Sequence, residues 1–244
     1  MPDNLHDHEQ LSDNALASFR LTEPPLGFVD DPYPWYTRLR LHNPVHQLGR
    51  KSYFLTRYDD VVTAYRDPRT SSDKKTEFTP KFGESPLLEH HTTSLVFNDP
   101  PLHTRVRRLI MGALNQRAIQ KMEEGLIKLI DELLDNMEDL EAVDIIRDFA
   151  ARIPIEVIGN LLDVPRDERQ PLRGWSLAIL SALEPAPEKS VLQAGNNAVV
   201  AFTDYLKLLV ADRRRSPGDP ASDVLTRLIS EKNDGENLTE AELL

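Results

Sequence analysis

The chain has 244 residues and a formal net charge of −11, because 40 acidic residues outnumber 29 lysines and arginines. Proteins that bind nucleic acid usually carry a basic surface, so this balance argues against a DNA or RNA partner. The sequence has no cysteine, which excludes disulfides and any thiolate metal ligand from within the chain. No apolar run approaches the roughly 18 residues that cross a bilayer, and residues 1–20 lack the pattern of a signal peptide. We therefore expect a cytoplasmic protein without a membrane partner.

Prolines interrupt regular secondary structure in the first part of the chain. Because they cluster between residues 23 and 34, residues 1–30 are expected to form a flexible N-terminal extension. Pro34 suits the first position of a helix. This helix is expected to end at His42, because Asn43 precedes Pro44 and a residue before proline is disfavoured in the helical conformation. This helix should be short.

A hairpin and a second helix are expected next. Residues 45–48 and 52–56 have strand-forming side chains and flank a three-residue loop, Gly49-Arg50-Lys51. Asp59 or Asp60 is expected to cap a helix that stops at Asp67-Pro68.

The segment 68–98 has no sustained period, which predicts a long and mostly irregular connection. Helical periodicity dominates after it. Helices are expected at residues 100–114, 117–137, 145–162, 166–183, 187–215 and 220–232. Arg213, Arg214 and Arg215 would lie at a helix C-terminus, where the macrodipole favours cations.

One stretch carries the most information: Asp99-Pro100-Pro101-Leu102-His103-Thr104-Arg105-Val106-Arg107-Arg108-Leu109-Ile110. Asp99 is a candidate N-cap, and Pro100 suits the first helical position. At about 100° per residue, His103 and Arg107 share one flank of an apolar arc. Such a donor pair suits an anionic group half inside a core. A solvated basic face with a boundary histidine is the alternative, and the spacing alone favours it.

This stretch resembles the C-helix region of bacterial cytochrome P-450 monooxygenases, in which Asp-Pro-Pro is followed by a His two residues on and an Arg four beyond it. Other stretches resemble the same family in the same order, namely residues 31–36 (A helix), 54–61 (first hairpin and B helix), 153–165 (E helix) and 223–244 (H helix and the approach to the I helix). We therefore expect a mainly α fold with a small β-hairpin, the N-terminal portion of the cytochrome P-450 fold. Residues 31–244 would form the N-terminal half of such a domain, from the A helix to the start of the I helix.

The resemblance also implies a function. It implies a heme-dependent monooxygenase that hydroxylates a small apolar substrate with electrons from a ferredoxin-type partner. His103 and Arg107 would bind the propionates of heme b, whereas the substrate pocket would be bordered by Leu95, Val96 and Phe97. Helices near residues 175–183 and 191–202 would form a movable lid. Arg105 and Arg108 would lie nearer the surface, facing either an acidic electron-transfer partner or solvent.

Two parts of the family pattern do not occur in these 244 residues: the cysteine whose thiolate ligates the heme iron, and the Glu-x-x-Arg motif of the K helix. Thr239 followed by Glu242 indicates a capping box, which resembles the opening of the I helix. We therefore interpret the chain as the N-terminal half of such an enzyme, with no catalytic residue of its own, binding heme only when the other half is supplied. The alternative is a non-catalytic helical remnant or binding module.

Other chemistry has little support in the sequence. No Gly-x-Gly or P-loop phosphate cradle occurs. His90-His91 and His6-x-His8 lack convergent partners, so no metal site is expected.

Overall fold

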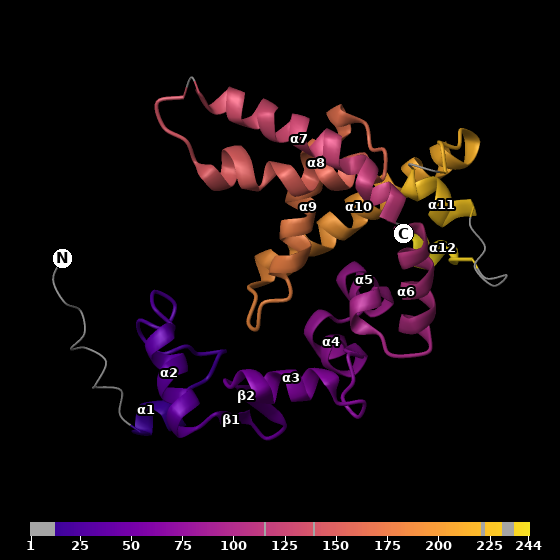
Figure 1. The fold of residues 1–244 in the computed structure, drawn as a ribbon. Coiled ribbons are helices and arrows are strands. Elements are labelled where there is room, and N and C mark those ends of the chain that lie inside the picture. The colour runs from indigo at the N-terminus through magenta and orange to yellow at the C-terminus, as the bar shows by residue number, and fades with distance from the viewer. Residues whose placement is uncertain (1–12, 115, 139, 221–222, 231–236) are drawn as a thin grey trace. The chain divides into compact units, whose positions relative to one another are not determined.

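The computed structural model describes residues 13–114, 116–138, 140–220, 223–230 and 237–244. Within these ranges the chain is mainly helical, with one two-stranded antiparallel sheet, which confirms the predicted fold class (Figure 1). The chain divides into two compact units, residues 1–71 and residues 72–244.

The first unit combines helices with the hairpin. Its elements are α1 (Asp13–Ala17), α2 (Tyr33–His42), β1 (Val45–Gly49), β2 (Ser52–Leu55) and α3 (Tyr58–Arg66). The hairpin loop is one residue shorter than expected, because Gly49 still pairs with Ser52 beyond an irregularity in register. The expected cap of α3 was wrong: Asp59 and Asp60 lie in its first turn, and its N-cap is Arg57.

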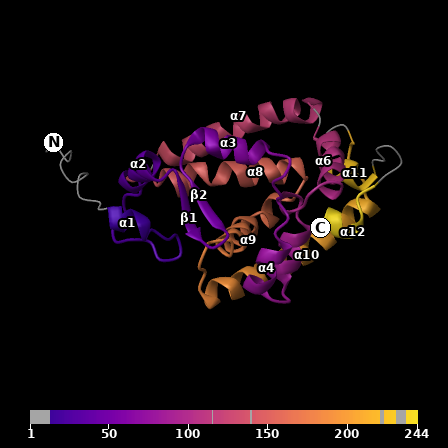
Figure 2. The same cartoon turned by 90° about the horizontal axis from the view of Figure 1, so that it is seen from below.

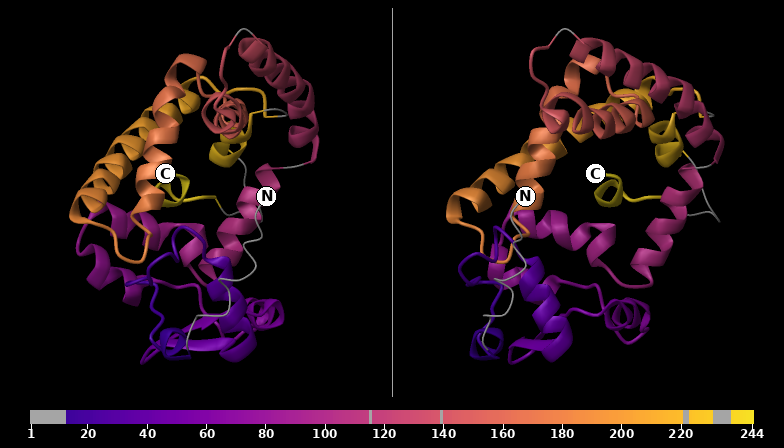
Figure 3. Two further views of the ribbon diagram at one scale, coloured as in Figure 1. Left: turned by 90° about the vertical axis from the view of Figure 1, so that its left-hand side faces the viewer. Right: turned by 60° about the vertical axis from the view of Figure 1, so that its left-hand side comes forward.

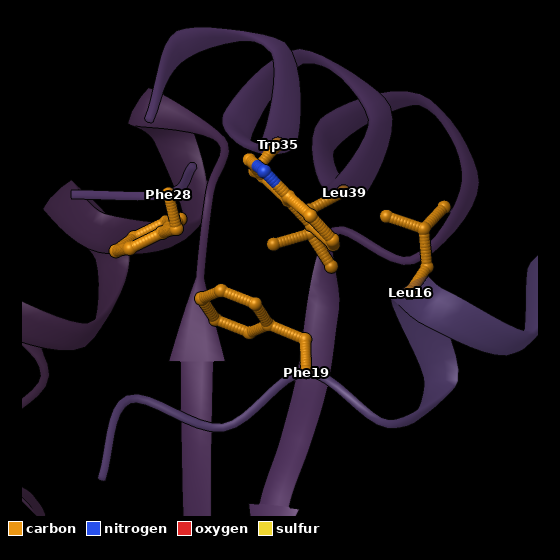
Figure 4. Packing of buried hydrophobic residues seen from close by; sticks show 5 residues of the cluster. All are labelled: Leu16, Phe19, Phe28, Trp35 and Leu39. Atoms are coloured by element: carbon orange, nitrogen blue, oxygen red, sulfur yellow. The ribbon is translucent and has the colours of Figure 1, made fainter. Parts of the chain in front are cut away.

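Phe19 lies at the centre of the core of this unit (Figure 4). Its ring centroid lies 5.1 Å from that of Phe28 and 6.1 Å from that of Trp35. The buried His46 donates from Nε2 to the carbonyl of Phe19 at 3.0 Å, since a carbonyl only accepts. Its Nδ1 then accepts from the side chain of Asn43 at 2.8 Å. Both ring nitrogens of this buried histidine are therefore satisfied.

This core corrects the expectation that residues 1–30 are a flexible extension. Leu16, Phe19 and Phe28 are buried against Trp35 and Leu39 of α2, so this stretch contributes to the packing of the unit. Residues 1–12 lie outside the described residues, and the domain boundary at residue 31 stays a prediction.

The second unit is built from helices. In chain order they are α4 (Lys75–Phe82), α5 (Pro86–Thr93), η2 (Leu95–Phe97), α6 (Leu102–Ala113), α7 (Gln116–Glu138), η3 (Ile145–Ala150), α8 (Arg152–Leu161), η4 (Arg166–Glu168), α9 (Gln170–Ser181), α10 (Lys189–Arg215), α11 (Val224–Ser230) and α12 (Glu240–Leu243). α7 runs along α8 (Figure 2). α9 and α10, both orange, pack on each other (Figure 3).

The prediction of an irregular connection over residues 68–98 was wrong, because α4, α5 and η2 lie there. α5 begins with two start signals: the hydroxyl of Ser85 accepts from the N–H of Leu88 at 3.3 Å, and Pro86 follows at the first helical position. Tertiary contacts also hold α5. The N–H of Leu87 donates to Asn196 Oδ1 at 3.0 Å, and the Leu87 side chain is fully buried.

Two helix starts were also predicted. Asp99 does not cap α6, since its Oδ1 accepts from the N–H of Ser72 at 2.8 Å and the N-cap is Pro101. The capping box of α12 is confirmed: Glu242 Oε2 accepts from the N–H of Thr239 at 2.9 Å.

A buried ion pair joins three parts of this unit. Arg213 of α10 donates to Asp223 Oδ2 at 2.7 Å, ahead of α11, and to Asp163 Oδ2 at 2.8 Å, in the turn after α8. Arg213 and Asp223 are both buried, and Thr226 also donates to the Asp223 carboxylate. This arginine, predicted only to favour the helix dipole, thus has specific partners.

Candidate functional site

α6 places His103 and Arg107 one turn apart, at the edge of its buried face. Val106, Leu109 and Ala113 are buried on that face, whereas His103 is half-buried and Arg107 is exposed. The helical spacing that puts the two donors on one flank is therefore present in the structure.

The two donors differ from Arg105 and Arg108 in having no partner among the residues that the structure describes. Neither the His103 nor the Arg107 side chain makes a hydrogen bond or ion pair with another described residue. Arg105, on the opposite flank, forms an ion pair with Glu242 of α12 and is only 26% exposed. Arg105 thus lies against α12, and Arg108 is engaged as well. Of the three arginines of α6, only Arg107 has no partner among the described residues, and it lies with His103 on the flank that the sequence singled out.

This pair fits the cofactor that the resemblance implies. A guanidinium presents a planar fork of donors that matches a carboxylate, and an imidazole adds a further donor. The two propionates of a heme are carboxylates of this kind, so Arg107 can offer them a cationic fork and His103 a further donor. Their assignment to heme stays a prediction.

The segment predicted to border the substrate forms η2. Val96 is 67% exposed, whereas Leu95 and Phe97 are half-buried. The Phe97 ring lies 5.1 Å from the ring of Phe78 and 5.7 Å from that of His91, both nearly perpendicular to it. Val96 is therefore open to solvent while Phe97 packs on other rings, and the role of these three residues at a substrate pocket stays a prediction.

His91 is a residue that the sequence analysis did not single out as functional. It is 2% exposed and is surrounded by Phe78 and Phe82 of α4 and by Phe97, yet its Nε2 has no hydrogen-bond partner among the described residues. Burial, together with the electrostatic effects of His90 and Lys81, lowers the pKa of His91 to about 4. Its ring is therefore neutral at pH 7. The only feature of the sequence that drew attention to His91 was the adjacent His90.

A cavity of about 470 Å³ lies between α5, α10 and α12. It is lined by Pro86, Glu89, His90, Thr93, Val199, Val200, Thr203, Asp204, Lys207, Glu240, Ala241 and Leu244. None of the predicted site residues is in this lining. The α10 residues on its wall overlap the stretch 191–202 that was predicted to cover the substrate.

Lys81 ties α4 to the segment between α9 and α10. Its Nζ donates to the carbonyls of Leu183 at 3.1 Å and Glu184 at 2.7 Å. Partial burial lowers the pKa of Lys81, against the opposing effect of Glu77 and Glu184. A single side chain thus links α4 to the connection of the two helices predicted to form a lid.

In the described ranges, no group of three or more His, Cys, Asp or Glu residues is arranged to hold a metal ion. His6 and His8 fall outside those ranges. Over the same part of the chain, no helix combines the length and apolar character needed to cross a membrane.

Comparison with known proteins gives a consistent result. No protein-family profile matches the chain. A protein named cytochrome P450 from Bacillus subtilis (strain 168) is 31% identical over 233 residues, which cover 91% of this chain and 55% of that protein. Cytochrome P450 107B1 from Saccharopolyspora erythraea is 32% identical over 232 residues, covering 89% of this chain and 54% of that protein. The chain spans about half the length of the curated relatives it matches.

Solved structures of cytochromes P450 are also similar to this chain. Epothilone B-bound cytochrome P450epoK is similar with a TM-score of 0.77 at 30% identity, over 92% of this chain and 57% of that one. P450BioI, solved in complex with an acyl carrier protein carrying hexadec-9Z-enoic acid, is similar with a TM-score of 0.78 at 25% identity, over 88% of this chain and 55% of that one.

Proposed function

Since the chain corresponds to the N-terminal part of bacterial cytochromes P450, we propose that it supplies the heme-propionate and substrate-binding side of a P450 monooxygenase. The observation that carries the proposal is the pair of donors on α6, His103 and Arg107, which have no partner among the described residues while Arg105 beside them is engaged.

Each part of the chain has a role in this proposal. Arg107 and His103, one turn apart on α6, would hold the propionates of heme b, Arg107 through its planar guanidinium and His103 as a further donor. Leu95, Val96 and Phe97 border a small, largely apolar substrate, and α9 and α10 cover it. A ferredoxin-type protein in the cytoplasm delivers the electrons. When bound, the heme supplies the iron at which dioxygen is activated for insertion of one oxygen atom into the substrate.

The thiolate ligand of the iron has to come from outside these residues, since none of the 244 is a cysteine. This absence favours a second candidate function for the chain taken alone, a non-catalytic helical binding module. The two candidates differ in whether heme binds and whether a thiolate reaches its iron.

Heme titration separates the candidates. The chain is titrated with heme alone and after mixing with a polypeptide that carries the remaining part of the Bacillus subtilis relative, and the reduced carbon-monoxide complex is recorded. We expect a thiolate-type absorption band only in the mixture. Failure of both samples to bind heme leaves the binding module as the function of this chain.

Two variants test the assigned donors. Arg107→Ala should weaken heme binding about tenfold, because it removes a charge-assisted hydrogen bond. Arg173→Ala is the matched control, since Arg173 is an exposed arginine on α9 without a described partner. Equal affinities of the two variants would remove the propionate assignment while leaving the family relation intact.

A further inference from the structure

One wall of the cavity between α5, α10 and α12 is formed by α5, which is held by packing on its other face. Pro86, Glu89, His90 and Thr93 follow the i, i+3, i+4, i+7 spacing, so one face of α5 lines the cavity. The other face is held by Leu87, which is fully buried and bonded to Asn196 of α10. Ligand sites are usually preformed in this way.

The opposite wall offers apolar surface. Val199 is buried in the core between α5 and α10, whereas Val200 is 48% exposed beside it. Leu244 contributes a further apolar side chain. A volume of about 470 Å³ lies within the range of small-molecule sites, roughly 300–1,000 Å³. The cavity therefore has room for an apolar body of moderate size.

The charges around this cavity are only partly balanced. Asp204 is paired with Lys207 at 3.2 Å, and Glu240 is paired with Arg214 at 2.6 Å. The Glu89 carboxylate, in contrast, makes no hydrogen bond or ion pair with any described residue.

His90, the neighbour of Glu89, does not offset this charge. Burial lowers the pKa of His90, so its imidazole is neutral at pH 7. The exposed Glu89 thus adds an unpaired negative charge to a lining that otherwise combines apolar residues, neutral polar groups and the ion-paired Asp204, Lys207 and Glu240.

We propose that this cavity binds an apolar molecule that carries a cationic amine, with Glu89 as its counter-ion. The apolar body packs against Val200 and Leu244, and the ammonium group lies at the α5 wall. A carboxylate ligand of the same shape is repelled there. The inference goes beyond the proposed function, because Leu95, Val96 and Phe97 do not line this cavity and binding at these residues requires no heme.

Three probes of one shape test the charge preference. Adamantan-1-amine, adamantan-1-ol and adamantane-1-carboxylate share a rigid apolar body and differ in charge. Isothermal titration of the full chain is expected to show the amine binding about fivefold tighter than the alcohol, and the carboxylate most weakly. Equal affinities of amine and alcohol, or no binding of any probe, overturn the proposal.

Glu89→Gln tests the named residue. This variant should bind the amine and the alcohol equally, because the shape is kept and the charge is removed. Glu84→Gln is the matched control, since Glu84 is exposed, lies just ahead of α5 and is not part of the lining. A fivefold preference that survives in Glu89→Gln overturns the assignment.

The absence of cysteine allows a second readout that locates the site. Thr93→Cys introduces the only thiol, on the cavity wall, and Ser216→Cys introduces it at an exposed position outside the lining. Adamantan-1-amine should slow maleimide labelling of the first thiol and leave the second unchanged. Equal labelling rates with and without the amine refute this location. Heme titration of the same samples reports on the proposed function separately.

Discussion

We predict that the buried imidazole of His91 makes the stability of the second unit depend on pH. Three phenylalanine rings enclose it, and Nε2 has no partner among the described residues. The titratable groups that affect the pKa of His91 are His90 on the same helix and Lys81 on α4, and both oppose its protonation. Protonating His91 in the fold would place a cation in an apolar cage, which explains the direction of its pKa shift.

The magnitude follows from the two pKa values. In the fold the pKa of His91 is lowered from 6.5 to about 4. Between these values the unfolded chain binds the extra proton, so the free energy of unfolding decreases as the pH falls below about 6.5. At pH 5.5 the loss is about 1.4 kcal/mol, and at pH 4 it approaches about 3 kcal/mol. Above pH 7 the contribution is complete.

His91→Leu isolates this contribution, since it keeps an apolar side chain of similar volume and removes the titration. Urea unfolding at pH 7.5 should show the variant about 1 kcal/mol more stable, because a buried unsatisfied nitrogen is gone. At pH 5.5 the difference in free energy of unfolding between the variant and the unmodified chain should be larger by about 1.3 kcal/mol. His42→Leu, at an exposed histidine of α2, is the control for hydrophobic substitution. An advantage of His91→Leu that is the same at both pH values would refute the reasoning.

Two further substitutions test contacts within the second unit. Arg213→Met should lower the free energy of unfolding by about 3 kcal/mol, because it leaves a buried carboxylate uncompensated, whereas Arg215→Met, at an exposed position, should change it by less than about 0.5 kcal/mol. A urea titration that gives equal losses would contradict the role of the buried ion pair. Lys81→Met removes the donor to the carbonyls of residues 183 and 184, so amide hydrogen exchange there should accelerate about tenfold. Unchanged exchange, or the same acceleration in Lys75→Met, would show that this link is not what holds the segment.

The long helices of this fold are predictable from the sequence because apolar residues recur at a helical period over many turns. The helix expected at residues 117–137 is observed at 116–138, and the one expected at 187–215 is observed at 189–215. Their ends agree within a residue or two, which is the usual uncertainty of helix boundaries.

Short elements were missed for two physical reasons. A helix of eight residues such as α5 spans too few turns for a period to show, and its stability comes from contacts with α9 and α10 far away in the sequence. The prediction of Asp99 as a cap failed because its carboxylate accepts instead from the N–H of Ser72, a contact that the sequence around Asp99 does not reveal.

For the candidate site, too, the local part was predictable from the sequence and the part built from distant segments was not. Helical geometry alone places His103 and Arg107 on one flank, so their relation was readable from the sequence. The cavity combines residues 86–93, 199–207 and 240–244, and no local pattern connects such distant segments.

α5 connects the His91 cage with the cavity, because one of its faces packs in the interior and the other lines the cavity. Leu87 and His91, four residues apart, face the interior, where one packs on α10 and the other enters the phenylalanine cage. Glu89 and His90 face the cavity. Because a helix is rigid over two turns, a substitution that disturbs the buried face also moves the residues on the cavity face. The stability of the His91 cage and the shape of the cavity are therefore coupled, and His91→Leu should be tested for amine binding as well as for stability.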